Sequence, residues 1–309
     1  MDLYNTYSYM DLPAKGIIIG VDIGGTKIQA GAIDKEGTIV CNPVTSETIG
    51  DDKSENIFNR IAGTMELVIK NSGILPSDIM GIGMGVTGPL DTELGTILEC
   101  PQLPTMHFFP LRERIIERFR LPVVMDNDAN ALILGESVWG AGKGHRTTLG
   151  FTLGTGLGCA IVSEGRLFSG TNGMAGEIWP SPYNEETIED VVSGRGVSAI
   201  YQRLTNQAKT AKEISLLAQN GDANAIEAWN VFGNALGFAV AWGINMIDPG
   251  IVILGGSIAN SYSLFFDSMD KIVRKTICPV PSDKTRIVKA ALGDNAGFIG
   301  SAALVIQGK

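Results

Sequence analysis

The sequence has only four cysteines, two histidines and little charge for its length of 309 residues. The cysteines form no CxxC or CxC pair, which is typical of free thiols in a reducing compartment and not of a disulfide framework. Hydrophobic residues make up 44% and charged residues 18%, a balance that indicates a globular chain and not a disordered one. The net charge of −9 disfavours nucleic acid or an anionic membrane as a partner.

The sequence also lacks a recognisable secretory signal and a recognisable membrane-spanning stretch. Residues 1–15 have no basic stretch followed by an apolar run, so they do not match a secretory signal, and we interpret them as a loose polar extension. The most apolar stretch, near residues 237–247, contains Asn245 and stops at Asp248, which makes it too short to span a bilayer. We expect a cytoplasmic protein with no membrane partner.

Strands alternate with helices along the chain, which predicts an α/β fold. Two strand–glycine-turn–strand units, about 130 residues apart, indicate an old duplication with one unit in each of two domains. The predicted strands are residues 17–22, 26–33, 79–86, 121–125, 148–162 (a hairpin), 251–254 and 286–288; the predicted helices are 55–70, 112–119, 128–139, 223–246 and one from 296. We place the domain boundary near Leu121.

The segment GVDIGGTK at residues 20–27 follows the first buried strand. Its glycines let backbone N–H groups approach a phosphate, and the carboxylate of Asp22 can hold Mg²⁺ directly or through water. A plain hairpin with a Gly-Gly turn is the alternative, and it is sufficient if the segment is taken alone. The segment is not a Walker loop, because Lys27 follows Thr26 instead of preceding it.

A second glycine turn, GTGLG at residues 154–158, lies on the later hairpin. Its spacing is GxGxG and it leads into a strand, so a dinucleotide-binding Rossmann site does not fit the structural context. Two phosphate-sized glycine turns that face a common cleft would suit a nucleoside triphosphate.

The segment DNDAN at residues 126–130 lies where a strand gives way to a helix. Helix capping alone would need only Asn127. Because a sugar hydroxyl is a poor nucleophile, a nearby carboxylate such as Asp128 can take its proton while it attacks the γ-phosphate.

Two later glutamates, Glu177 and Glu189, can accept hydrogen bonds from adjacent hydroxyls of a polyol. Taken alone, both are better interpreted as solvated surface residues. The only histidines, His107 and His145, are interpreted as loop residues without a catalytic part.

Together and in this order, these segments resemble the ROK family of sugar kinases and repressors, within the actin-like ATPase superfamily. The resemblance covers nearly the whole chain after Lys15. It also includes GVTGP at residues 85–89, PQLP at 101–104, DP at 248–249 with GG at 255–256, and GDNAG at 293–297. The ordered set is far more specific than any one segment.

The resemblance implies two actin-like (ribonuclease H-like) α/β domains that flank a cleft. The smaller would contain residues 1–121 and a closing C-terminal helix at 296–309, and the larger would contain residues 122–295. The resemblance also implies Mg·ATP as the phosphoryl donor and a homodimer.

The same resemblance assigns roles to matching residues. Asp128 falls at the general base of the family. The implied sugar contacts are Asn127, Glu177, Glu189 and Gly88. The implied nucleotide contacts are Asp22 (with Mg²⁺), Gly24, Gly25, Thr26, Lys27, Thr155, Gly156, Gly255 and Gly256.

The chain departs from the family at a zinc motif. Many members follow the glutamate with Ile-Gly-His and a CxCGxxGC run, whereas here Pro180 takes the place of the histidine and residues 181–188 contain no cysteine. Since all four ligands are missing together, the sequence predicts a zinc-free subgroup. That histidine also contacts the sugar in relatives, so Pro180, together with Gln102 in place of an asparagine, leaves the identity of the sugar open.

The sequence therefore predicts an ATP-dependent kinase acting on the exocyclic hydroxyl of a hexose. Glucose is the first candidate, fructose, mannose, an N-acetylhexosamine and a β-glucoside are alternatives, and polyphosphate is an alternative donor. A repressor is disfavoured because fifteen residues before the first strand are too few for a winged helix-turn-helix. A sugar-binding pseudoenzyme is disfavoured by the retention of Asp128.

Overall fold

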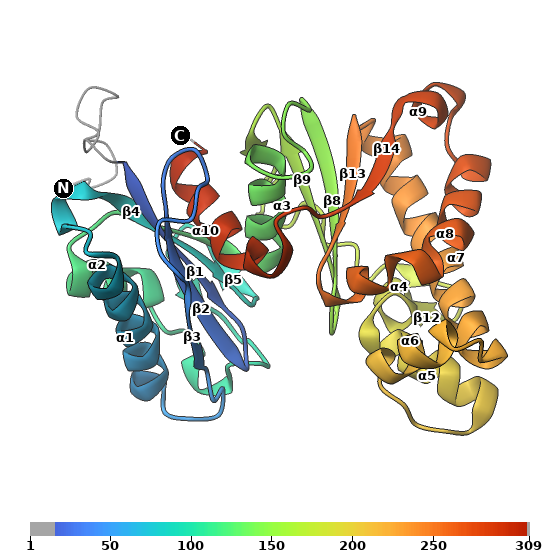
Figure 1. The fold of residues 1–309 in the computed structure, drawn as a ribbon, viewed down its shortest axis with the longest axis horizontal. Helices are drawn as coiled ribbons and strands as arrows, with labels where there is room; N and C mark the ends of the chain where they lie inside the picture. Colours follow the sequence, from blue (N-terminus) through green and yellow to red (C-terminus); the bar gives the residue numbers. More distant parts are fainter. Residues whose placement is uncertain (1–15, 308–309) are drawn as a thin grey trace. The chain divides into compact units, whose positions relative to one another are not determined.

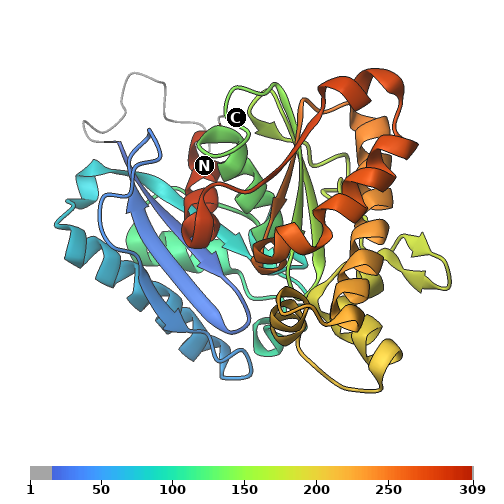
Figure 2. The ribbon, with the colours of Figure 1, turned by 45° about the vertical axis from the view of Figure 1, so that its right-hand side comes forward.

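The computed structural model describes residues 16–307, so the loose extension expected at residues 1–15 lies outside the described part. The chain divides into two compact units (Figures 1 and 2). Unit 1 contains residues up to Gly135 together with Leu292 onwards, and unit 2 contains Glu136–Ala291. No helix within residues 16–307 has both the length and the apolar character that crossing a bilayer requires.

Unit 1 is built on a five-stranded sheet in which β1, β4 and β7 run parallel and β2 and β3 extend the sheet antiparallel. Across the sheet the order is β3 (Val44–Glu47), β2 (Lys27–Ile33), β1 (Ile17–Ile23), β4 (Ile79–Val86) and β7 (Val123–Asn127). The helices are α1 (Ser54–Ser72), α2 (Leu111–Phe119), α3 (Asp128–Val138) and α10 (Ala296–Ile306), and the short elements are η1 (Pro76–Asp78), β5 (Leu90–Asp91), β6 (Thr96–Ile97), η2 (Pro104–Met106) and η4 (Gly293–Asn295).

The two faces of this sheet are covered differently (Figure 1). On one face, Ile19, Val21 and Ile23 of β1 join the core formed with α1 and α2. On the other face, Gly20 lies directly against α10, where a Cβ would stand 2.9 Å from the carbonyl carbon of Phe298. The glycines that interrupt the strands therefore let the closing helix approach the sheet backbone.

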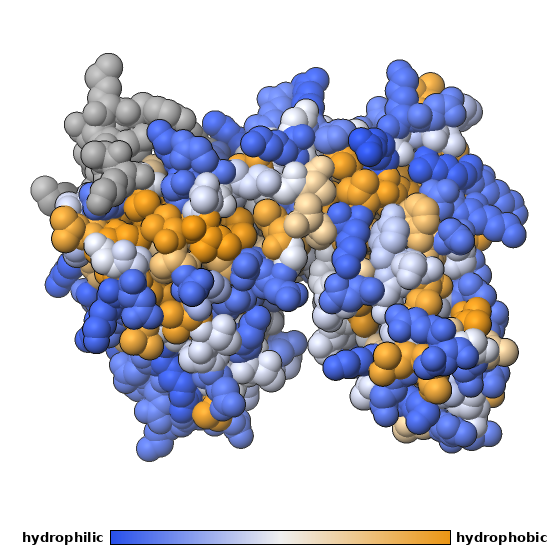
Figure 3. Space-filling view, in the orientation of Figure 1, coloured by the Kyte–Doolittle hydropathy of each residue, from blue (hydrophilic) through white to orange (hydrophobic). Residues whose placement is uncertain are grey.

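Figure 3 shows polar and apolar residues mixed over the part of unit 1 that contains α1 and α2. Two exposed ion pairs join these helices, Arg114 to Glu55 at 2.8 Å and Arg118 to Glu66 at 2.7 Å. Pairs of this exposure contribute little to stability, so the helices are held mainly by their apolar side.

Unit 2 repeats the strand plan of unit 1. Its order is β10 (Arg166–Leu167), β9 (Leu157–Ser163), β8 (Thr147–Leu153), β13 (Ile251–Gly255) and β14 (Arg286–Lys289), with β9 antiparallel and β13 and β14 parallel to β8. In each unit the strands, numbered along the chain, have the order 3-2-1-4-5 across the sheet. This shared topology is what a duplication would produce.

Helices fill the rest of unit 2 and pack on an aromatic core in which Phe232 contacts both Trp229 and Phe265 edge to face. These helices are α4 (Ile188–Val191), α5 (Gly194–Thr205), α6 (Ala211–Gln219), α7 (Ala223–Ile247), α8 (Tyr262–Thr276) and α9 (Pro279–Lys284), and the short elements are β11 (Pro182–Tyr183), β12 (Glu186–Thr187) and η3 (Ser257–Ser261).

The α/β class is confirmed, and the division into units differs from the expected boundary near Leu121. Residues 122–135 belong to unit 1, because β7 pairs in parallel with β4 at the edge of the same sheet. Residues 292–295 also belong to unit 1, since they lead directly into α10. This pairing joins residues 41 positions apart, such as Ile82 and Val123, so the local change of pattern at residue 126 does not predict it.

Candidate functional site

The predicted residues form two groups, one in each unit. In unit 1 the carboxyl ends of the parallel strands β1, β4 and β7 lie at the same edge of the sheet. Their register aligns Asp22 with Gly85 and Gly85 with Asp126, and residues aligned in this way point to the same face. This face is the one that α10 covers, because a Cβ at Gly297 would lie 2.6 Å from the Asp22 carboxyl carbon.

Because Gly85 has no side chain, Asp128 can lie over the aligned residues Asp22, Gly85 and Asp126. A Cβ at Gly85 would lie 3.5 Å from the Asp128 Cα, so the start of α3 rests above the glycine. Desolvation, together with the nearby charge of Asp128, raises the pKa of Asp22 to about 6, and Lys27 opposes both effects. Two carboxylates that are more than 100 residues apart in the sequence are thus electrostatic neighbours.

This pair predicts a measurable effect of Asp22→Asn on stability. The folded pKa of about 6 lies above the ordinary value of 3.8. Below pH 3.8 the carboxyl is protonated in both states and does not lower the free energy of unfolding, whereas above pH 6 it is ionised in both states and lowers that free energy by its full amount. We expect Asp22→Asn to raise the free energy of unfolding by up to about 3 kcal/mol at pH 7.5 in the absence of ligands, since one pKa unit corresponds to about 1.4 kcal/mol.

Urea unfolding of both proteins between pH 3.5 and 8 measures this effect. The stability difference should grow as pH rises through the window from 3.8 to 6 and then stay level. A difference that is the same at pH 4 and pH 7.5 would show that the charge of Asp22 is not its cause.

The first glycine turn is held from one side by Thr48, a fully buried residue that follows β3. The Thr48 hydroxyl donates to the Gly24 carbonyl at 2.6 Å, and the Thr48 N–H donates to the Thr26 carbonyl at 3.0 Å. Since C=O and N–H point in opposite directions across a trans peptide, the N–H groups of Gly25 and Lys27 are turned away from Thr48. The turn therefore presents backbone donors on one side, as a phosphate requires.

The junction of β7 and α3 shows why the DNDAN segment is so polar. The Asn127 Oδ1 and the Asp128 Oδ1 both accept from the Ala129 N–H, at 2.9 and 2.8 Å, so part of the segment does act as a helix cap. Asp126 accepts from the Asn130 side chain at 2.8 Å. The Asn127 Nδ2 lies 3.1 Å from where a Cβ of Gly88 would stand, so these two predicted sugar contacts are neighbours.

In unit 2 the second glycine turn packs against Glu189. The Glu189 Oε2 accepts from the Leu157 N–H at 2.9 Å, and a Cβ at Gly156 would lie 2.5 Å from that oxygen. The side chain of Glu189 is 21% exposed and its Oε1 accepts from Arg195 at 2.9 Å. The interpretation of Glu189 as a solvated surface residue therefore does not hold, because two separate groups, the Leu157 N–H and the Arg195 guanidinium, bond its carboxylate.

Glu177 remains exposed, in the loop before β11. Burial raises the pKa of the Cys159 thiol to about 12, and the charge of Glu177 contributes in the same direction, so this carboxylate lies near β9. Further along the loop, the Trp179 carbonyl accepts from the Glu189 N–H at 3.3 Å. The loop that carries Glu177 and Pro180 thus runs beside Glu189.

The remaining predicted pair, Gly255 and Gly256, lies at the end of β13. Gly255 is paired with Thr152 of β8, shortly before the second glycine turn. Gly256 has φ +84°, and a Cβ there would lie 2.8 Å from the Leu153 carbonyl carbon. Only glycine fits this conformation and this close approach.

Three residues that the sequence analysis did not assign stand next to the predicted ones: Thr48, Gly297 and Arg195. Gly297 belongs to the GDNAG segment, which formed part of the family resemblance but was given no role. Thr48 and Arg195 had no signal, because each acts on a turn that is distant in the sequence. His107, whose Nε2 lies 3.1 Å from the Cys100 carbonyl oxygen, and His145 lie in loops as expected.

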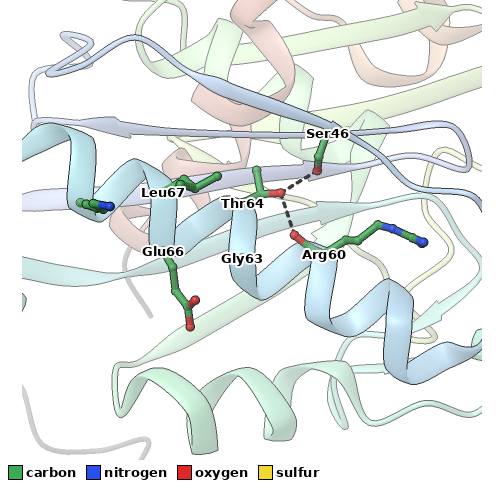
Figure 4. A pocket seen from close by; sticks show the side chains of 7 residues that line it. Ser46, Arg60, Gly63, Thr64, Glu66 and Leu67 are labelled. Carbon is green, nitrogen blue, oxygen red and sulfur yellow. Dashed lines mark hydrogen bonds between the residues drawn. The ribbon is translucent and has the colours of Figure 1, made fainter.

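One groove in unit 1 contains none of the predicted sugar or nucleotide residues. This shallow groove of about 480 Å³ lies between α1 and β3 (Figure 4), and two of its polar side chains, Ser46 and Thr64, bond each other at 2.6 Å. Among residues 16–307, no group of three or more His, Cys, Asp or Glu side chains is arranged to hold a metal ion.

Comparisons with known proteins place this geometry in context. The sequence model of the ROK family matches residues 18–308. The chain is 30% identical to the glucokinase of Thermotoga maritima, over 93% of this chain and 96% of that one. It is equally 30% identical to the N-acetyl-D-glucosamine kinase of Vibrio cholerae, over 93% and 99%. The crystal structure of a ROK family glucokinase from Streptomyces griseus in complex with glucose and AMPPNP superposes with a TM-score of 0.78 at 30% identity, over 95% and 100%.

Proposed function

The chain belongs to the ROK family and is an ATP-dependent sugar kinase of that family, and from this premise we propose that it phosphorylates the exocyclic 6-hydroxyl of a hexose with Asp128 as the general base. The observation that carries the proposal is the position of Asp128 at the start of α3, over Gly85 and beside Asp22. The relatives are named for glucose and N-acetylglucosamine phosphorylation, and one solved relative binds glucose with an ATP analogue.

In the proposed reaction the hydroxyl oxygen attacks the γ-phosphorus of ATP, and the bond from that phosphorus to the β-phosphate oxygen breaks. The proton of the hydroxyl passes to a carboxylate oxygen of Asp128, and the products are the sugar phosphate and ADP. The Asn127 amide can donate to the sugar, and the carboxylates of Glu177 and Glu189 can accept from its hydroxyls. Gly88 leaves room beside Asn127 for this contact.

The two glycine turns would hold the phosphates through backbone N–H groups, those of Gly25 and Lys27 in unit 1 and of Thr155 and Gly156 in unit 2. Preorganised donors of this kind stabilise charge without reorganising during the reaction. Gly24 and Thr26 supply the carbonyls by which Thr48 fixes the first turn. In the proposal, Gly255 and Gly256 lie near the nucleotide.

The residues of unit 1 fit a magnesium ion. Asp22 is partly buried and its pKa is raised partly by the charge of Asp128, a repulsion that a divalent cation would relieve. Asp22 would hold the ion directly or through water. When bound with ATP, Mg²⁺ neutralises charge on the phosphate oxygens.

Glucose is the first candidate substrate, and equal identity to a glucokinase and an N-acetyl-D-glucosamine kinase keeps both sugar classes in the proposal. The test is ADP release by purified protein with Mg·ATP against glucose, fructose, mannose, N-acetylhexosamines and β-glucosides, with polyphosphate as a second donor. Strong turnover on one sugar identifies the substrate. If folded protein releases no ADP with any sugar of the panel, the proposed kinase activity is contradicted.

We predict that the purified protein contains no structural zinc. Pro180 takes the place of the family's histidine, and the cysteines are free at four dispersed positions. Elemental analysis after dialysis against metal-free buffer should give far less than one zinc per chain. One zinc per chain would refute this prediction.

We also propose a cytoplasmic homodimer without a nucleic-acid partner. The net charge of −9 and the free thiols support this part of the proposal, and the family resemblance supports the dimer. Light scattering during gel filtration should give twice the mass of one chain.

A further inference from the structure

The first turn of α5 lies against the second glycine turn and binds two of its carbonyl groups. The Gly194 N–H donates to the Gly154 carbonyl at 2.8 Å. The next residue, Arg195, donates from Nε to the Thr155 carbonyl at 3.2 Å. Two consecutive peptide groups of the turn are thus held on their carbonyl side by two consecutive residues of one helix.

Fixing these two carbonyls also fixes the directions of the N–H groups in the same two peptide planes. The N–H of Thr155 shares a peptide plane with the Gly154 carbonyl, and the N–H of Gly156 shares one with the Thr155 carbonyl. Both N–H groups therefore point away from α5. Within the part of the chain that the structure describes, neither has a hydrogen-bond acceptor, which leaves both available for a ligand.

The same guanidinium reaches a second group. An Arg195 Nη donates to the Glu189 Oε1 at 2.9 Å, while the other oxygen of Glu189 accepts from the N–H of Leu157, the fourth residue of the turn. Arg195 therefore bonds both the glycine turn and the carboxylate proposed to bind the sugar. A guanidinium can do this because its nitrogens donate in fixed, diverging directions.

We propose that Arg195 is a positioning residue that fixes the glycine turn at 154–156 for the ATP phosphates and orients Glu189 for the sugar. The inference rests on the proposed function, since it assigns an effect on the ligands of that reaction. Arg195 acts through these two groups and does not itself touch either ligand. Its side chain is 67% exposed, so its removal should change stability little while changing ligand affinity.

The experiment compares Arg195→Ala and Arg195→Lys with wild type. Kd for AMPPNP is measured by calorimetry, and KM for ATP and for the sugar is measured by ADP release. We expect Arg195→Ala to raise Kd for AMPPNP and KM for ATP about tenfold, the size of one lost charge-assisted hydrogen bond, and to raise KM for the sugar several-fold. Arg195→Lys keeps one cation for Glu189 but cannot reproduce the fork, so it should restore KM for the sugar more than KM for ATP.

Arg203→Ala is the matched control on the same helix. It removes an exposed ion pair, Arg203 to Glu186 at 2.8 Å, that does not involve the glycine turn. Its kinetic constants should equal those of wild type, and the melting temperatures of all variants should lie close together.

The outcomes separate the two proposals. Wild-type protein that phosphorylates no sugar contradicts the proposed function. Active wild type together with AMPPNP and sugar constants in Arg195→Ala that stay within twofold of it contradicts the role of Arg195. An equal change in Arg203→Ala also contradicts it, because the effect would then be a general loss of surface charge on α5.

Discussion

Replacing Asp128 with asparagine should lower kcat by about 10²- to 10⁴-fold, the range that a positioned general base contributes. Asparagine keeps the size of the side chain, and its Oδ1 can still accept from the Ala129 N–H, as the Asp128 Oδ1 does at 2.8 Å. It cannot accept the proton of the attacking hydroxyl. We therefore expect a folded protein that binds sugar and AMPPNP with affinities near those of wild type but turns over very slowly.

The measurement is kcat for the preferred sugar beside calorimetric binding of that sugar. Glu55→Gln is a suitable control, because it also removes a carboxylate from the first turn of a helix in unit 1, one that pairs with Arg114 and is not among the predicted site residues. That variant should keep wild-type turnover. A kcat of Asp128→Asn within tenfold of wild type would show that another group takes the proton.

Replacing Gly83 with alanine should destabilise the protein by about 4 kcal/mol or more, which is among the largest effects that single substitutions have. A Cβ at Gly83 would lie 2.7 Å from the carbonyl carbon of Ser301 and 3.1 Å from the Ala302 Cα. These atoms belong to the backbone of α10, so no side-chain rotation can relieve the overlap. The closing helix would have to move away from β4, which lies inside the sheet between β1 and β7.

Gly63→Ala provides the contrast. Gly63 lies on the face of α1 that lines the groove in Figure 4, and a Cβ there would meet no atom within 4 Å. Alanine favours helix over glycine, so this variant should gain about 0.5–1 kcal/mol. Urea unfolding of both variants, with soluble yield as a second readout, checks the pair; a Gly83→Ala protein as stable as wild type would contradict the close packing of α10.

Local patterns were sufficient to predict much of the fold. The helix expected at residues 223–246 is observed as Ala223–Ile247, and the strand expected at 79–86 is observed as Ile79–Val86. Apolar periodicity and turn residues act over a few neighbouring positions, and that is why one sequence can report them. Short edge strands such as β3 and the pairs β5–β6 and β11–β12 were missed, because two to four residues carry too little pattern.

The candidate site was also partly predictable from the sequence. Glycine turns and a polar strand–helix junction are local motifs, so residue type and spacing alone point to Asp22, Asn127 and Asp128. The environment of each residue could not be predicted in this way. That Asp22 is desolvated beside Asp128 depends on the register of three parallel strands and on the missing side chain at Gly85.

The sequence by itself determined the α/β class, the family resemblance and the chemical character of the site, because these depend on residue type and local spacing. Only the tertiary structure decided that residues 122–135 and 292–295 belong to the first unit, that Thr48 and Arg195 bond the two glycine turns, and that Glu189 is held instead of solvated. Each of these facts is a contact between segments distant in the chain. Such contacts are set by strand register and close packing, which no local pattern encodes.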